Sequence, residues 1–125
     1  MESFARTLSS VTQEKIIVLL NFPNNPAGYT LLASEVDPVV NEIHRLAKAG
    51  KKIVVLIDDA YFGLVYEENV FKESIFTRLA GLHENILAVK LDGPTKEDYV
   101  WGFRVGFITF GVKNGTPELY EALEN

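Results

Sequence analysis

The sequence has no cysteine among its 125 residues, which excludes a disulfide framework and a thiolate metal site. No apolar run approaches the roughly 20 residues that a membrane-spanning helix needs, and residues 1–14 lack the apolar centre of a signal peptide. The chain also lacks an excess of basic residues, because its net charge is −5. The composition therefore gives no indication of a positively charged surface that would bind nucleic acid. We therefore expect a soluble, cytoplasmic protein with no nucleic-acid or membrane partner.

The length and the apolar content are those of one folded unit. A chain of this size buries roughly two-thirds of its unfolded surface, and its hydrophobic fraction of 47% is ordinary for a globular protein. Short apolar runs that end in polar loops predict four strands, at residues 15–20, 52–57, 86–91 and 103–110. Helical spacing and start or stop residues predict helices at residues 3–12 (weakly), 34–50, 71–82 and 116–125.

The predicted helix ends depend on particular residues. Ser34 is a candidate N-cap, and Asp37 three residues later would complete a partial capping box. Gly50 is the expected stop of the same helix, because glycine adopts the left-handed conformation that follows a helix. Pro117 suits the first turn of the last helix, where its absent N–H has no partner to lose.

The order of these elements predicts an α/β fold with parallel strands joined by crossover helices. Ligands of such sheets bind beyond the carboxyl ends of the strands. Asn25 follows the first strand, Asp58 ends the second, and Lys96 follows the third. Three chemically useful side chains are therefore expected at one end of the sheet, which predicts a site there.

The side chains expected at this site suit one cofactor, pyridoxal 5′-phosphate. Such a cofactor needs a lysine for its aldehyde and an acid for its ring nitrogen, which Lys96 and Asp58 supply. Its phosphate needs a cation with forked donors, such as Arg104. An acidic pair like Asp58–Asp59 is also typical of a Mg²⁺ site. Tyr61, three residues after Asp58, selects Asp58 over Asp59 as the acid for the ring nitrogen, and strand alternation would turn Asp59 to the opposite face. We expect no metal.

Three segments in this order resemble the class I/II aminotransferases, within the fold-type I pyridoxal-phosphate enzymes. Residues 21–28, Asn-Phe-Pro-Asn-Asn-Pro-Ala-Gly, resemble the family's loop rich in Asn and Pro. Asp58-Asp-Ala-Tyr61 resembles its Asp-x-x-Tyr element, and Lys96 followed by Arg104 resembles its lysine signature. The resemblance implies a mixed four-stranded sheet in the order 1-2-3-4 with the last strand antiparallel. It also implies that residues 1–125 are a single partial domain, the central part of the large domain.

The resemblance implies a role for each residue. Lys96 would hold the cofactor covalently and later move a proton at the substrate's α-carbon. Asp58 would pair with the ring nitrogen, and Tyr61 and Asn25 would donate to the ring oxygen. Arg104 would grip the phosphate. Many relatives carry a serine three residues before the lysine, where this chain has Gly93, so Thr95 is the remaining hydroxyl for the phosphate.

The implied activity is transfer of an amino group from an amino acid to a 2-oxo acid. The family's phosphate-binding loop, ring-stacking aromatic and substrate-binding arginine have no counterpart here, so we expect the 125-residue chain to be inactive alone. Another fold-type I activity, such as a carbon–sulfur lyase, a decarboxylase or a cyclising synthase, shares the same cofactor residues. A receiver-like binding module is a further alternative, disfavoured because Thr95 and Lys96 are adjacent.

Self-association is the last expectation. If both crossover helices lie on one face of the sheet, residues 1–14 and 112–125 must cover the other face, and they are short and only partly apolar. The first strand carries no proline or inward charge to protect its edge. Exposed apolar surface of this kind is usually buried by another chain, so we expect a homo-oligomer.

Overall fold

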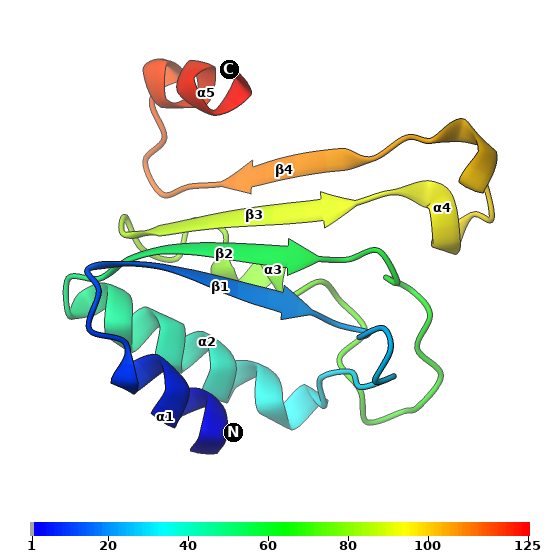
Figure 1. The fold of residues 1–125 in the computed structure, drawn as a ribbon, viewed down its shortest axis with the longest axis horizontal. Helices are drawn as coiled ribbons and strands as arrows, with labels where there is room; N and C mark the ends of the chain where they lie inside the picture. Colours follow the sequence, from blue (N-terminus) through cyan, green and yellow to red (C-terminus); the bar gives the residue numbers. More distant parts are fainter. Residues whose placement is uncertain (1) are drawn as a thin grey trace.

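The computed structural model describes residues 2–125 as a four-stranded sheet with helices packed on one of its faces (Figure 1). No helix of this part of the chain is long and apolar enough to span a membrane. The strands are β1 (Lys15–Asn21), β2 (Lys52–Asp58), β3 (Ile86–Asp92) and β4 (Phe107–Gly111). The helices are α1 (Glu2–Ser10), α2 (Ala33–Lys48), α3 (Phe76–Leu79), α4 (Pro94–Glu97) and α5 (Pro117–Glu124), with a 3₁₀ turn η1 (Trp101–Phe103).

The sheet has the predicted topology. Its strand order is β1-β2-β3-β4, with β1, β2 and β3 parallel and β4 antiparallel to β3. β1 is an outer strand, as the predicted order implies. The predicted mixed sheet and its order are therefore confirmed.

The hydrophobic core lies between the sheet and the helices. Alternate residues of β1 and β2 point to this side, because successive side chains of a strand face opposite ways. Ile43 of α2, Leu79 of α3 and Val55 of β2 are all fully buried in it. Both connections between the parallel strands therefore contribute helices to the same face, as predicted.

The first helix lies on this face too, which contradicts the prediction that residues 1–14 cover the other one. Leu8 of α1 belongs to the core, and Ser9 accepts a hydrogen bond from Arg45 of α2 over 3.0 Å. The apolar side of the amphipathic helix α1 therefore packs on the core beside α2. Only residues 112–125 remain for the opposite face, and there α5 brings Leu119 to the rim of a groove of about 550 Å³ beside Ile17.

Two helix ends follow the predictions, and one does not. Gly50 follows α2 with φ +94°, and Pro117 is the first residue of α5. Thr116 caps α5 by accepting from the Leu119 N–H over 3.3 Å, which was not predicted. Ser34 is not the cap of α2, which begins at Ala33. Instead, the carboxylate of Glu35 reaches back and accepts from the Leu32 N–H over 3.0 Å. This acid in the first turn of α2 therefore satisfies the backbone donor of the residue that precedes the helix.

The predicted helix at residues 71–82 is wrong for most of its length, because only Phe76–Leu79 is α-helical. Val70 forms an antiparallel bridge with Leu32, and the Phe71 N–H donates to the Leu31 carbonyl over 2.8 Å. These tertiary hydrogen bonds hold the start of the segment extended. The fourth strand is also shorter than predicted, beginning at Phe107, because residues 101–103 form η1.

Candidate functional site

The predicted site residues come together beyond the carboxyl ends of β1, β2 and β3, at the end of the sheet where α4 lies (Figure 1). An open pocket of about 330 Å³ there is lined by Asp58, Thr95, Lys96 and Arg104. This volume is at the lower end of the range for small-molecule sites. Asn25 and Tyr61 complete the predicted set from two neighbouring loops.

Asn25 and Tyr61 are joined directly. The side-chain amide of Asn25 donates to the Tyr61 hydroxyl over 2.9 Å. The Asn25 loop is closed by two backbone hydrogen bonds, from the Asn24 N–H to the Tyr29 carbonyl (2.8 Å) and from the Gly28 N–H to the Asn24 carbonyl (2.7 Å). Gly28 has φ +68°, a conformation that glycine adopts without strain. The tight loop therefore fixes the backbone that carries Asn25.

Lys96 is carried by α4, the short helix that follows β3. Its Nζ lies 5.7 Å from the centre of the Tyr61 ring, within the range of a cation–π contact. Its side chain is exposed and forms no ion pair among the described residues. The amine on the pocket wall is therefore adjacent to the phenol and unconstrained by a carboxylate of residues 2–125.

Asp58 ends β2 and is held from both sides. Its Oδ2 accepts from the side-chain amide of Asn21 over 3.0 Å, and its Oδ1 accepts from the Ala60 N–H over 3.1 Å. Asn21 ends β1 directly opposite Asp58 in the parallel register. No role was predicted for Asn21 from the sequence, and the alignment of the two strand ends is the structural signal that identifies it.

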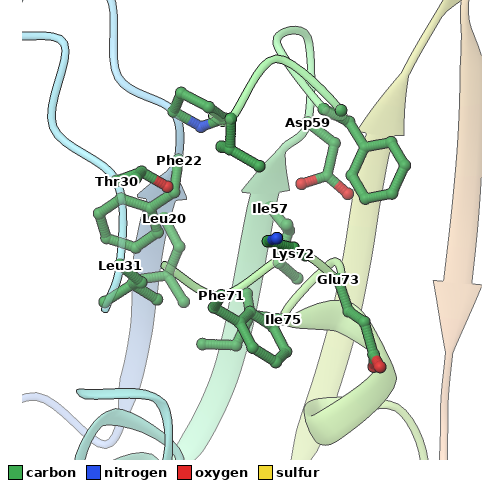
Figure 2. A pocket seen from close by; sticks show the side chains of 14 residues that line it. Leu20, Phe22, Thr30, Leu31, Ile57, Asp59, Phe71, Lys72, Glu73 and Ile75 are labelled. Carbon is green, nitrogen blue, oxygen red and sulfur yellow. The ribbon is translucent and has the colours of Figure 1, made fainter. Parts of the chain in front are cut away.

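Asp59 points to the opposite face, as strand alternation predicted. It is buried, and its Oδ2 lies 3.8 Å from the Nζ of Lys90, which also pairs with Asp92 over 2.6 Å. Burial raises the pKa of Asp59 above the usual value, and hydrogen bonding to Ser74 and the Lys90 cation offset this only in part. Figure 2 shows its carboxylate beside a small cavity lined by Ile57 and Phe71. Asp59 therefore belongs to the core side and not to the pocket of Asp58.

Arg104 reaches the pocket from the connection between α4 and β4. Its backbone is in the left-handed region, with φ +52°. The neighbouring carbonyl oxygen of Val105 passes close to Gly93, where an added Cβ would lie 3.0 Å from it. A serine at position 93 would therefore require a shift of this backbone, which gives a physical reason for the glycine. Thr95, partly exposed, is the hydroxyl that lines the pocket instead.

The comparisons with known proteins agree with this geometry. Residues 1–124 match the family model of aminotransferase class I and II. The chain belongs to the class I and II aminotransferases. This membership removes the receiver-like module from consideration. No curated protein is significantly similar to the chain.

Solved aminotransferases share the fold of this aminotransferase chain. An aminotransferase from Anaerococcus prevotii matches 99% of the chain with 24% identity and a TM-score of 0.80, over 31% of its own length. An alanine aminotransferase from Pyrococcus furiosus matches 97% with 22% identity and a TM-score of 0.66, over 28% of its length. A PLP-bound structure from Clostridium difficile, assigned as an aminotransferase, matches 98% with 15% identity and a TM-score of 0.61, over 28% of its length. The chain thus spans less than a third of each.

Proposed function

We propose that residues 1–125 form a single partial domain that holds pyridoxal 5′-phosphate for an aminotransferase, which transfers an amino group from an amino acid to a 2-oxo acid. The observation that carries the proposal is the convergence of an amine, a carboxylate and a guanidinium around one pocket at the carboxyl ends of the parallel strands. A phenol–amide pair lies beside this pocket, with the Tyr61 ring 5.7 Å from the Lys96 amine. This donor set fits the aldehyde, ring nitrogen, ring oxygen and phosphate of the cofactor, one group for each.

The cofactor, when bound, supplies an aldehyde and an electron-withdrawing ring. Lys96 would bind the aldehyde through its amine. Once the substrate's amine has displaced it, Lys96 would move a proton at the substrate's α-carbon, since a neutral amine is both nucleophile and base. Asp58, with its carboxylate oriented by two hydrogen bonds, pairs with the ring nitrogen. Asn25 and Tyr61 donate to the ring oxygen. Arg104 binds the phosphate through its forked donors, and Thr95 adds a hydroxyl.

The substrate side of the reaction is not provided by the described residues. Arg104 is the arginine that lines the pocket, whereas Arg45 and Arg78 pair with Glu42 and Asp37 of α2. The remaining arginine, Arg6, lies on α1. Holding both reactants accounts for about 7–11 kcal/mol of a barrier. We therefore propose that the 125-residue chain binds cofactor weakly and does not transaminate. Sustained 2-oxo acid production from a common amino acid by the purified chain would contradict this.

Cofactor binding can be tested directly. Pyridoxal 5′-phosphate is titrated into the purified chain while the visible absorption band is recorded, and the mixture is then reduced with borohydride and mapped by mass spectrometry. We expect the reduced adduct on Lys96 and its loss in Lys96→Met. Lys113→Met, an exposed lysine at the far end of the sheet, is the control and should keep the adduct. Labelling spread evenly over surface lysines, or no band at all, would overturn the proposed function.

A further inference from the structure

Asn21 contacts Asp58, the acid proposed for the cofactor's ring nitrogen, but does not itself line the pocket that contains Lys96. It is the last residue of β1, and the parallel register places it beside Asp58, the last residue of β2. Its side chain is partly buried, and its Nδ2 lies 3.0 Å from the Oδ2 of Asp58. The contact joins residues 37 positions apart in the sequence, so it depends on the correct pairing of the two strands.

The direction of this hydrogen bond follows from chemistry. A carboxylate only accepts, so the amide nitrogen of Asn21 must face it, because the amide oxygen there would bring two acceptors together. The Oδ1 of Asn21 is buried with no hydrogen-bond partner among the described residues. An unsatisfied buried acceptor destabilises a fold. Asparagine is therefore a costly residue at this position if its only role is to fill space.

The hydrogen bond changes how Asp58 is held. The Ala60 N–H binds one carboxylate oxygen and Asn21 binds the other, so rotation of the carboxylate is restricted from both sides. Asp58 forms no ion pair within residues 2–125. The donor that orients it is thus neutral, and its negative charge stays available to a cationic group in the pocket.

We infer that Asn21 is a positioning residue, which orients Asp58 toward the ring nitrogen of the cofactor. The inference rests on the proposed function, because it gives Asp58 the ring nitrogen as its partner. Asn21 acts through Asp58 alone. Its effect should therefore appear only with ligands that carry a ring nitrogen, which a general structural role cannot imitate.

The experiment compares two ligands and two leucine variants. The ligands are pyridoxal 5′-phosphate and its analogue in which a C–H replaces the ring nitrogen. The variants are Asn21→Leu and the matched control Asn85→Leu, which loses a partly buried side-chain hydrogen bond of 3.1 Å to the Ala47 carbonyl at the opposite end of the sheet. Affinity, the pH midpoint of the visible band and the denaturant midpoint are measured for each.

We expect Asn21→Leu to weaken pyridoxal 5′-phosphate about tenfold, the size of one hydrogen bond to a charged group, and to move the pH midpoint of the band. Its affinity for the analogue should equal that of the parent, and its denaturant midpoint should not fall, since the unsatisfied acceptor is removed. Asn21→Gln keeps a donor and should recover part of the affinity. Asn85→Leu should leave both affinities unchanged.

The outcomes separate the two proposals. Equal losses for both ligands in Asn21→Leu and Asn21→Gln, or no loss for either ligand, would overturn the role of Asn21 while leaving the cofactor site standing. If Asn21→Leu does not fold, the comparison of the two ligands in Asn21→Gln decides the same question. A parent chain that binds neither ligand would overturn the proposed function, and the inference with it.

Discussion

The side-chain amide of Asn25 donates to the hydroxyl of Tyr61 over 2.9 Å, although 36 positions separate the two residues in the sequence. Asn25 lies in the loop after β1 and Tyr61 in the loop after β2, so the parallel pairing of these strands brings the groups together. An amide and a phenol that share a hydrogen bond are oriented before any ligand arrives, which lowers the entropic cost of binding one.

The first prediction concerns this pair. Asn25→Ala and Tyr61→Phe should each weaken pyridoxal 5′-phosphate about fivefold to tenfold, because each removes one donor to the ring oxygen. The double variant should lose less than the product of the two single losses, since each residue orients the other. The measurement is a double-mutant cycle of affinities from the visible band. Losses that multiply would show that the hydrogen bond has no part in ligand binding.

The second prediction concerns Arg104 and compares a ligand that carries the phosphate with one that lacks it. Arg104→Gly should weaken pyridoxal 5′-phosphate by roughly tenfold to a hundredfold, because charge-assisted hydrogen bonds to the phosphate are lost. Affinity for pyridoxal, which lacks the phosphate, should not change. Thermal unfolding should shift little, because relief of the left-handed conformation (φ +52°), worth about 1 kcal/mol, offsets the added freedom of glycine.

Arg45→Ala is the control for this measurement. Arg45 is an exposed cation that pairs with Glu42 on α2, far in the fold from the pocket. Its removal changes the net charge of the chain by the same amount as Arg104→Gly. If both variants lose the same affinity, the phosphate is attracted by general charge and not bound by Arg104.

The strands and their order were predictable from the sequence because buried parallel strands are nearly continuous apolar runs. The positions of Asp58 and Lys96 at one end of the sheet were predictable because Asp58 ends one such run and Lys96 follows another. Asn21 was not recognised, because its hydrogen bond depends on the register between β1 and β2. The start of the predicted helix at residues 71–82 failed for a similar reason, since the backbone of Phe71 pairs with Leu31 from a distant segment.

Asp59 provides the third prediction, on stability and pH. Burial raises its folded-state pKa above the ordinary 3.8, so ionising it opposes folding. This cost is absent below about pH 3.8 and grows as the pH rises through the folded-state pKa. The side chain introduced by Asp59→Asn cannot ionise, so this variant should be more stable than the parent at neutral pH. The expected gain in the free energy of unfolding is about 1.4 kcal/mol for each unit by which folding raises the pKa of Asp59. The advantage should vanish in acid. Denaturant unfolding from about pH 3 to 8 measures it.

The neighbouring charges define the control and the contrary outcome. Lys90 keeps Asp92 as its partner over 2.6 Å when Asp59 is replaced, so the substitution leaves no unpaired buried cation. Asp98→Asn, at an exposed position, should leave the pH dependence of the parent unchanged. A variant Asp59→Asn that is less stable than the parent at neutral pH would show that Lys90 requires both carboxylates.

The last prediction is self-association through the face of the sheet that carries no helix layer. Ile17 and Leu19 of β1 are 71% and 64% exposed, and Ile108 of β4 is 57% exposed on the same sheet. β1 is an outer strand whose edge groups have no partner strand on that side within residues 2–125, and such edges pair with other chains. We expect a dimer or larger oligomer by light scattering. The double variant Ile17→Lys with Leu19→Lys should convert the oligomer to a monomer, because association would then bury two lysine charges of each chain against the apolar sheet face of the other.

The matched control places the same two charges on the helical side. Ser34→Lys with Asn41→Lys alters exposed positions of α2, where substitutions change stability by about 0.5 kcal/mol or less. It should leave the oligomer intact. A parent chain that stays monomeric at high concentration would contradict the prediction. In that case, residues 112–125 would cover the open face more fully than the position of Leu119, in the same groove as Ile17, indicates.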